Sequence, residues 1–260
     1  MSKNEEWVNR YLNREKEAES FLEHLKKKYG LTTEQVIAII AYLWSKMGDN
    51  INYSVALSAG YLKARNRLFN LIDELFDDYL INNTTLYLKG IYVGSYKEAL
   101  SRLPFDFKNK GLPFLNDDYV LDRINVRWAG DGKLYSDRIW QHKSKLKFAM
   151  DTILKESIVS GRDIKKTSKD FAELMGSSYK NAERLVRTET NFVLNQSAMD
   201  VFVNTGVEKY EYIAKLDRRT SAICRATDGK IFLTSEAIVG VNYPPLHPNC
   251  RSTVAPVIEF

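Results

Sequence analysis

The chain has 260 residues, 44% of them hydrophobic and 27% charged, which is enough apolar material for the core of one large or two ordinary domains. This composition argues against disorder, and the longest strongly apolar run, residues 36–44, is too short to cross a bilayer. Because the N-terminus also lacks the hydrophobic region of a signal peptide, we expect a protein that is used in a cytosol without membrane contact. The net charge of +5 permits binding to nucleic acid without demanding it.

The first half of the chain has the periodicity of helices. Apolar and aromatic residues recur every three to four positions over residues 7–29, which predicts an amphipathic helix that ends at Gly30. A threonine at the start of residues 32–47 is expected to cap a second helix. Further helices are predicted over residues 62–80 and within 87–103. The sequence therefore predicts a mainly α N-terminal region.

An irregular connection is predicted over residues 104–132, which are richer in Pro, Gly, Asn and Asp than the rest of the chain. We place a domain boundary late in this segment. Beyond it, serine or threonine residues in capping positions precede three more amphipathic segments. The helices expected there cover residues 136–161, 167–174 and 177–203.

The pattern changes after residue 206, where polar and apolar residues alternate over 208–214 in the manner of a strand. Residues 230–233 follow an Asp-Gly pair and predict a second strand around a hairpin, and residues 252–258 predict a third. The expected fold is a mainly α N-terminal region with a small α+β C-terminal module. We expect the two domains to cover residues 1–125 and 126–260.

The residues with the most distinctive chemistry lie near the C-terminus. Both cysteines, Cys224 and Cys250, and one of the three histidines, His247, fall in this part of the chain. Three prolines within residues 244–248 restrict φ and remove amide donors, so we expect a rigid, non-helical corner that holds His247 and Cys250 at constrained positions.

The side chains of Cys224, His247 and Cys250 are suitable zinc ligands, since a His-x-x-Cys turn can place two donors on one metal. A structural zinc site needs four donors, and the fourth would have to be Asp217, Asp228 or a water molecule. The alternative is a buried cysteine packed against a proline-bounded turn. Because no fourth ligand is evident, we expect no cofactor, and zinc remains the open alternative.

A structural ion pair is predicted between the last long helix and the C-terminal module. Arg187 and Glu189 lie on the helix, Asp217 begins the segment after the first strand, and a guanidinium can bind a carboxylate through two parallel hydrogen bonds. An acid/base couple would need a substrate pocket and a nucleophile that nothing in the sequence specifies. We therefore predict no catalytic residues and a structural role for these three side chains.

Several motifs of the C-terminal module carry a family resemblance. Residues 217–224 read DRRTSAIC, residues 228–232 read DGKIF, and residues 244–252 read PPLHPNCRS. With Arg187-Thr188-Glu189 upstream, they make residues 126–260 resemble the C-terminal domain of phage minor head proteins, the Mu F-like head morphogenesis family. The resemblance implies a non-enzymatic minor capsid protein.

The resemblance also implies partners and a location. Family members associate with the portal vertex, take part in procapsid assembly, and in some cases affect DNA delivery. The partners implied are portal protein and capsid or scaffolding proteins, and the location implied is the virion, with the host cytoplasm during assembly. This chain departs from many relatives at Ser252, where they have a second cysteine in the C-R-C ending. The departure weakens any model of a metal site built from four thiolates.

Two other functional classes stay open. The C-terminal module could carry an enzyme or a toxin-like effector, or the chain could be a virion protein that binds DNA non-specifically. The second hypothesis rests on basic clusters such as Lys165, Lys166 and Lys169, which can bind phosphates by charge. The long charged helix predicted at the N-terminus suits docking to portal protein.

Overall fold

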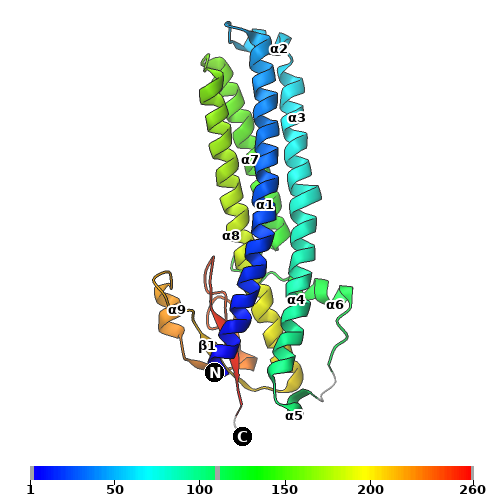
Figure 1. The fold of residues 1–260 in the computed structure, drawn as a ribbon, viewed down its shortest axis with the longest axis vertical. Helices are drawn as coiled ribbons and strands as arrows, with labels where there is room; N and C mark the ends of the chain where they lie inside the picture. Colours follow the sequence, from blue (N-terminus) through cyan, green and yellow to red (C-terminus); the bar gives the residue numbers. More distant parts are fainter. Residues whose placement is uncertain (1–2, 109–111, 259–260) are drawn as a thin grey trace. The chain divides into compact units, whose positions relative to one another are not determined.

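The computed structural model describes residues 3–108 and 112–258. The contacts between residues divide the chain into two compact units, which are considered separately (Figure 1). Unit 1 comprises residues 1–21, 84–135 and 184–260, and unit 2 comprises residues 22–83 and 136–183. The expected domain division between residues 125 and 126 stays a prediction.

Two helices are much longer than the sequence indicated. Helix α1 (Lys3–Met47) passes through Gly30 without a break, and α8 (Ile164–Thr205) joins the two helices predicted in that region (Figure 1). The hydroxyl groups of Thr32 and Thr33 donate to carbonyl groups four residues earlier, inside the helix, and do not cap a new one. A glycine inside a helix costs only about 1 kcal/mol, which the buried stripe on both sides of Gly30 outweighs.

The remaining helices also merge in places. The helices predicted over residues 62–80 and 87–103 are continuous in the structure, because a π-helical stretch joins them. In chain order the helices between α1 and α8 are α2 (Tyr53–Ser58), α3 (Tyr61–Asp73), the π-helical η1 (Glu74–Ile81), α4 (Asn82–Arg102), α5 (Phe105–Lys108), α6 (Asp117–Ile124) and α7 (Tyr135–Val159). Within the described ranges, no helix combines the length and the apolar character needed to span a membrane.

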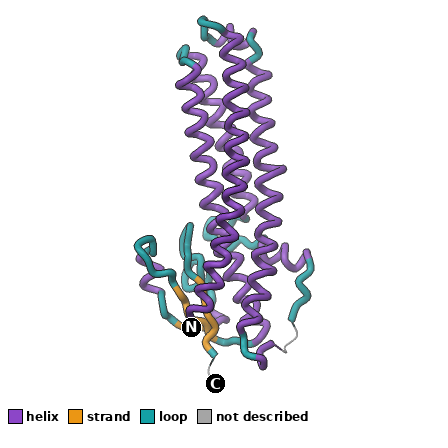
Figure 2. The backbone as a smooth tube through the Cα atoms, viewed as in Figure 1, coloured by secondary structure: helices purple, strands orange, loops and turns teal. Residues whose placement is uncertain are grey.

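The strands form one small antiparallel sheet in the C-terminal part of unit 1, shown in orange in Figure 2. Strand β1 (Lys209–Ile213) lies in the centre, between β2 (Ile231–Leu233) and β3 (Thr253–Val257). Between β1 and β2 along the chain comes the short helix α9 (Ala222–Thr227), and a 3-10 turn, η2 (Thr234–Glu236), follows β2. The predicted fold class, mainly α with a small α+β C-terminal module, is confirmed.

Unit 2 is built from helices with an apolar core. Leu25, Ile40, Leu75, Ile158 and Phe171 are fully buried there. Burial of side chains of this size stabilises the unit by about 1.5–3 kcal/mol each. The apolar positions that recur along the predicted helices are therefore buried against one another inside this unit.

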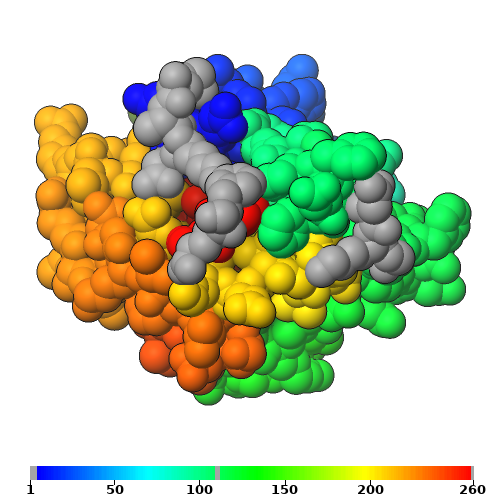
Figure 3. Space-filling model, turned by 90° about the horizontal axis from the view of Figure 1, so that it is seen from below, coloured from blue at the N-terminus to red at the C-terminus, as the bar shows by residue number. Residues whose placement is uncertain are grey.

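Unit 1 uses the beginning of α1 as part of its core. Trp7 and Tyr11 are buried, and the Trp7 ring packs edge-on against Phe202 of α8, with ring centroids 5.4 Å apart. Seen from below in Figure 3, the start of α1 (blue) and the C-terminal residues (orange to red) are exposed on the same face. The apolar residues at the start of this helix are thus occupied within the unit. The sequence suggested that the long charged helix suits docking to portal protein, and such docking stays a prediction that would have to use the exposed side chains of the helix.

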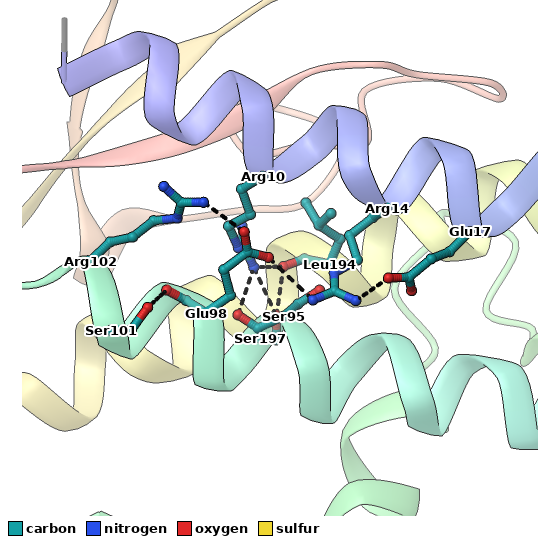
Figure 4. Close-up of polar contacts among 9 residues, drawn as sticks. All are labelled: Arg10, Arg14, Glu17, Ser95, Glu98, Ser101, Arg102, Leu194 and Ser197. Carbon is teal, nitrogen blue, oxygen red and sulfur yellow. Dashed lines mark hydrogen bonds and ion pairs between the residues drawn. The ribbon is translucent and has the colours of Figure 1, made fainter. Parts of the chain in front are cut away.

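A fully buried arginine lies in the same core (Figure 4). The Nη2 atom of Arg10 donates to the carbonyl oxygens of Ser95 and Leu194 and to the hydroxyl of Ser197, at 3.2, 2.8 and 3.1 Å. Burial lowers the pKa of Arg10 to about 10, an effect that the nearby Glu98 partly offsets. These hydrogen bonds connect α1, α4 and α8 within unit 1.

Candidate functional site

The predicted rigid corner contains a tight turn at His247-Pro248-Asn249-Cys250. The amide of Cys250 donates to the carbonyl of His247 at 3.1 Å, which closes a four-residue turn. Pro248 supplies the fixed φ of the first central position, and Asn249 adopts φ +58°, a left-handed conformation that asparagine tolerates better than most residues. The sequence H-P-N-C therefore brings the backbones of His247 and Cys250 together.

Cys224 reaches the same place from α9. Ser221 precedes this helix in an extended conformation, and its hydroxyl accepts a hydrogen bond from the Cys224 amide at 3.3 Å, as an N-cap residue does. Two hydrogen bonds of the Thr220 hydroxyl fix the loop before α9, since it donates to the Lys215 carbonyl at 2.6 Å and accepts from the Asp217 amide at 2.7 Å.

The three side chains predicted as metal ligands meet at this point. The Cys224 sulfur lies 3.8 Å from the Cys250 sulfur and 3.2 Å from Nε2 of His247, and all three donor atoms lie within 4.8 Å of one another. Both cysteines are buried and have free thiols, and they pack against Tyr212 of β1 and against Ala214, which follows that strand. The predicted convergence of these residues is present, whereas metal binding itself stays a prediction.

The two thiols have opposite acidities. A hydrogen bond from Cys250 lowers the pKa of Cys224 to about 4, while the same contact and burial raise the pKa of Cys250 above its ordinary value. The Tyr212 hydroxyl donates to the Cys224 sulfur at 3.3 Å and supports the same charge. Cys224 is thus the more acidic thiol of the pair.

The orientation of the His247 ring follows from its hydrogen bonds. Nδ1 lies 2.8 Å from the carbonyl oxygen of Pro248, and because a carbonyl only accepts, Nδ1 carries the hydrogen. In the neutral ring Nε2 then bears a lone pair, which faces the Cys224 sulfur and the Ser221 hydroxyl, the latter at 2.8 Å.

The ion pair predicted between Arg187 and Asp217 is wrong. Asp217 is held by two hydrogen bonds from Arg251, at 2.7 and 2.5 Å, whereas Arg187 donates to both carboxylate oxygens of Glu19 at 2.8 and 3.0 Å. The Arg251 hydrogen bonds lower the pKa of Asp217 below its usual range. The sequence contains Arg251 directly after Cys250, but spacing alone does not show that β3 returns beside the loop after β1.

Glu189, the third side chain with a predicted structural role, is buried on α8. Its carboxylate accepts a hydrogen bond from the indole nitrogen of Trp128 at 3.0 Å, and the Trp128 ring stacks on Phe192 at 5.1 Å between centroids. This contact fixes the segment before α7 to α8 within unit 1.

The polar residues that attach the C-terminal module to α8 were missed by the sequence reasoning. Asn191 and Asn195 donate to the carbonyl of Ser252 at 2.9 and 3.2 Å, and the Thr253 hydroxyl donates to Asn195 at 3.1 Å. The Thr188 hydroxyl accepts from the Asn249 amide at 3.0 Å. A signal was available, because positions 188, 191 and 195 lie on one helical face beside the apolar residues 192–194.

The space beside the three donors is very small. A cavity of about 10 Å³ borders Ser221, Cys224, His247 and Ser252, which is the room of one water molecule or a small ion. Of the carboxylates considered as fourth ligands, Asp217 binds Arg251 and Asp228 accepts from the amide of Ala214 at 2.7 Å. The cavity has no room for an organic substrate.

The basic residues proposed for DNA contact lie near the start of α8 in unit 2. Lys166 and Lys169 each have a carboxylate within 3.8 Å, from Asp163 and Glu173 respectively, and both lysines are exposed. Acidic and basic groups therefore alternate on this surface, as they do on an ordinary solvated helix face.

Comparison with known proteins identifies the class of the C-terminal part. The sequence model of the family described as "Phage Mu protein F like protein" matches residues 149–255, which include α8, the sheet and the Cys-His corner. The resemblance predicted from the sequence is confirmed over this segment, since residues 149–255 are similar to that family. The match supports a phage head morphogenesis protein.

A second comparison finds a relative that is described as an enzyme and not as a phage head protein. The chain is 21% identical over 238 residues to the NAD(+)-arginine ADP-ribosyltransferase EFV of Enterococcus faecalis strain V583. The alignment covers 84% of this chain and 47% of the relative, so the chain spans about half the length of that protein. No solved structure matches the chain.

Proposed function

We propose that the chain is a minor head protein that binds portal protein at the portal vertex, acts in procapsid assembly and takes part in DNA delivery. The observation that carries this proposal is the Mu F-like match over residues 149–255. The matched segment forms a connected structure in which α8 holds the C-terminal sheet through the hydrogen bonds of Asn191 and Asn195. Because these hydrogen bonds hold the sheet to the helix, the segment is suited to a fixed position in an assembly.

Contact with portal protein would use exposed side chains. The apolar residues at the beginning of α1 are buried in unit 1, and Glu15 and Glu19 of the same helix pair with Lys215 and Arg187. Deletion of this helix would therefore unfold unit 1 and would not test docking specifically. The proposal is better tested with the intact chain.

The test compares procapsids that assemble with and without portal protein. We expect the chain to be incorporated when portal protein is present and to be lost from purified procapsids when it is absent, with the major capsid protein as the control for assembly. Incorporation at the same level without portal protein would contradict the proposal.

The similarity to an ADP-ribosyltransferase favours one alternative, in which the chain belongs to an effector. The small cavity at the Cys-His corner speaks against catalysis there. We expect the purified chain to consume no NAD⁺ above the rate of a buffer control. Consumption that is lost in Cys224→Ala or His247→Ala, with the fold retained, would establish an enzyme in this module.

A further inference from the structure

The two sulfur atoms of the corner have the spacing of a tetrahedral zinc site, and Nε2 of His247 lies close to them. For zinc–sulfur bonds of about 2.3 Å, two sulfurs on one tetrahedral ion lie roughly 3.8 Å apart. The observed distance between the sulfurs of Cys224 and Cys250 is 3.8 Å. We propose that Cys224, His247 and Cys250 bind one zinc ion whose fourth coordination position is open to water or a small anion.

The histidine is already oriented as a ligand. A histidine that binds zinc commonly donates its other ring N–H to a backbone carbonyl, which fixes the tautomer and points the free nitrogen at the metal. His247 makes that bond to Pro248 and turns Nε2 toward the Cys224 sulfur, 3.2 Å away. For bonds of about 2.1 and 2.3 Å, nitrogen and sulfur on one tetrahedral ion lie about 3.6 Å apart, so a shift of a few tenths of an ångström admits the ion.

The surroundings leave the fourth position without a protein carboxylate. No Asp or Glu joins the three donors within the described part of the chain. Instead, the Ser221 hydroxyl lies 2.8 Å from Nε2 of His247, and Ser252 borders the same small cavity. The cavity of about 10 Å³ has room for the ion or one water molecule. The site is therefore a three-ligand centre with one exchangeable position.

The geometry also predicts how to complete the site. Ser252 is buried, with 1% of its surface exposed, and it borders the same small cavity as Cys224 and His247. Replacement by cysteine would add a third thiolate from a side chain of nearly the same size. Ser252→Cys should therefore convert an open site into a closed Cys₃His site.

The experiment uses the full chain, purified without chelators and with a reductant. We expect about one zinc per chain by elemental analysis, and titration of the metal-free protein with Co²⁺ should give the absorption of thiolate-bound tetrahedral cobalt. In competition with a chromophoric chelator, Ser252→Cys should bind zinc at least about tenfold more tightly than wild type, because a fourth protein ligand replaces water. His142→Ala, which changes a histidine outside the corner, is the control and should keep wild-type zinc content.

Three results would overturn the proposal. The first is protein without zinc that also shows no thiolate-bound cobalt spectrum in the wild type and in Ser252→Cys. The second is a Cys224–Cys250 disulfide, seen as a mass lower by two hydrogens, in freshly isolated protein that was never exposed to oxidant. The third is zinc content that persists unchanged in His247→Ala and in Cys250→Ala. The wild-type cobalt titration decides the question even if a substituted chain does not fold.

Discussion

The attachment of the C-terminal module to α8 depends most on Asn195. Its amide nitrogen donates to Ser252 and to the carbonyl of Asn191, and its oxygen accepts from the Thr253 hydroxyl, all in a fully buried environment. Asn195→Ala removes these bonds and leaves the Thr253 hydroxyl buried without its acceptor. An orphaned buried group costs about 1–3 kcal/mol and a lost hydrogen bond about 0.5–1.5 kcal/mol, so we expect a loss of about 2–4 kcal/mol.

Thermal unfolding followed by circular dichroism measures this loss. For a chain of this size the melting temperature should fall by roughly 5–15 °C, and amide exchange in β3 should become faster. Asn204→Ala is a matched control on the same helix, because Asn204 is partly exposed and makes a single long hydrogen bond to Tyr96 at 3.4 Å. The reasoning would be refuted if Asn195→Ala melted no lower than Asn204→Ala.

Two further predictions concern the ion pairs near the corner. Asp217→Asn should lower the melting temperature at pH 7. Because Arg251 holds the pKa of Asp217 below its usual value, the difference in melting temperature from wild type should be full above about pH 4 and should fade as the pH falls further. A difference that is constant down to about pH 2 would contradict this assignment. Arg187→Ala should lower the free energy of unfolding by no more than about 1 kcal/mol, since its partner Glu19 is about half exposed. A decrease of about 3 kcal/mol or more, measured by urea unfolding, would show that Arg187 has the structural role first predicted for it.

The strands and the Cys-His corner could be predicted because their signals are local. Alternation over residues 208–214 and the Asp-Gly pair before residue 230 reflect backbone preferences that survive in the sheet. The turn at residues 247–250 is set by Pro248 and Asn249, whose conformations are restricted before any tertiary contact forms. These features needed no knowledge of distant partners.

Helix lengths and long-range pairings could not be predicted in the same way. Gly30 is a reasonable helix stop on propensity alone, but packing on both sides of it decides that α1 continues. The choice of Arg251 over Arg187 as the partner of Asp217 depends on β3 pairing with β1, which brings together residues 34 positions apart. Likewise, the role of Asn195 appears only when the C-terminal segment lies against α8.

The measurement that tests the proposed function most directly is the position of the protein in the head. The turn between α7 and α8 at Ser160–Gly161 is exposed and suits insertion of a small tag. Electron microscopy of procapsids that contain the tagged chain, bound to a tag-specific antibody fragment and reconstructed without imposed symmetry, should show the label at a single vertex, the one that holds portal protein. Label distributed over all vertices, or absent from procapsids that contain portal protein, would contradict the assignment.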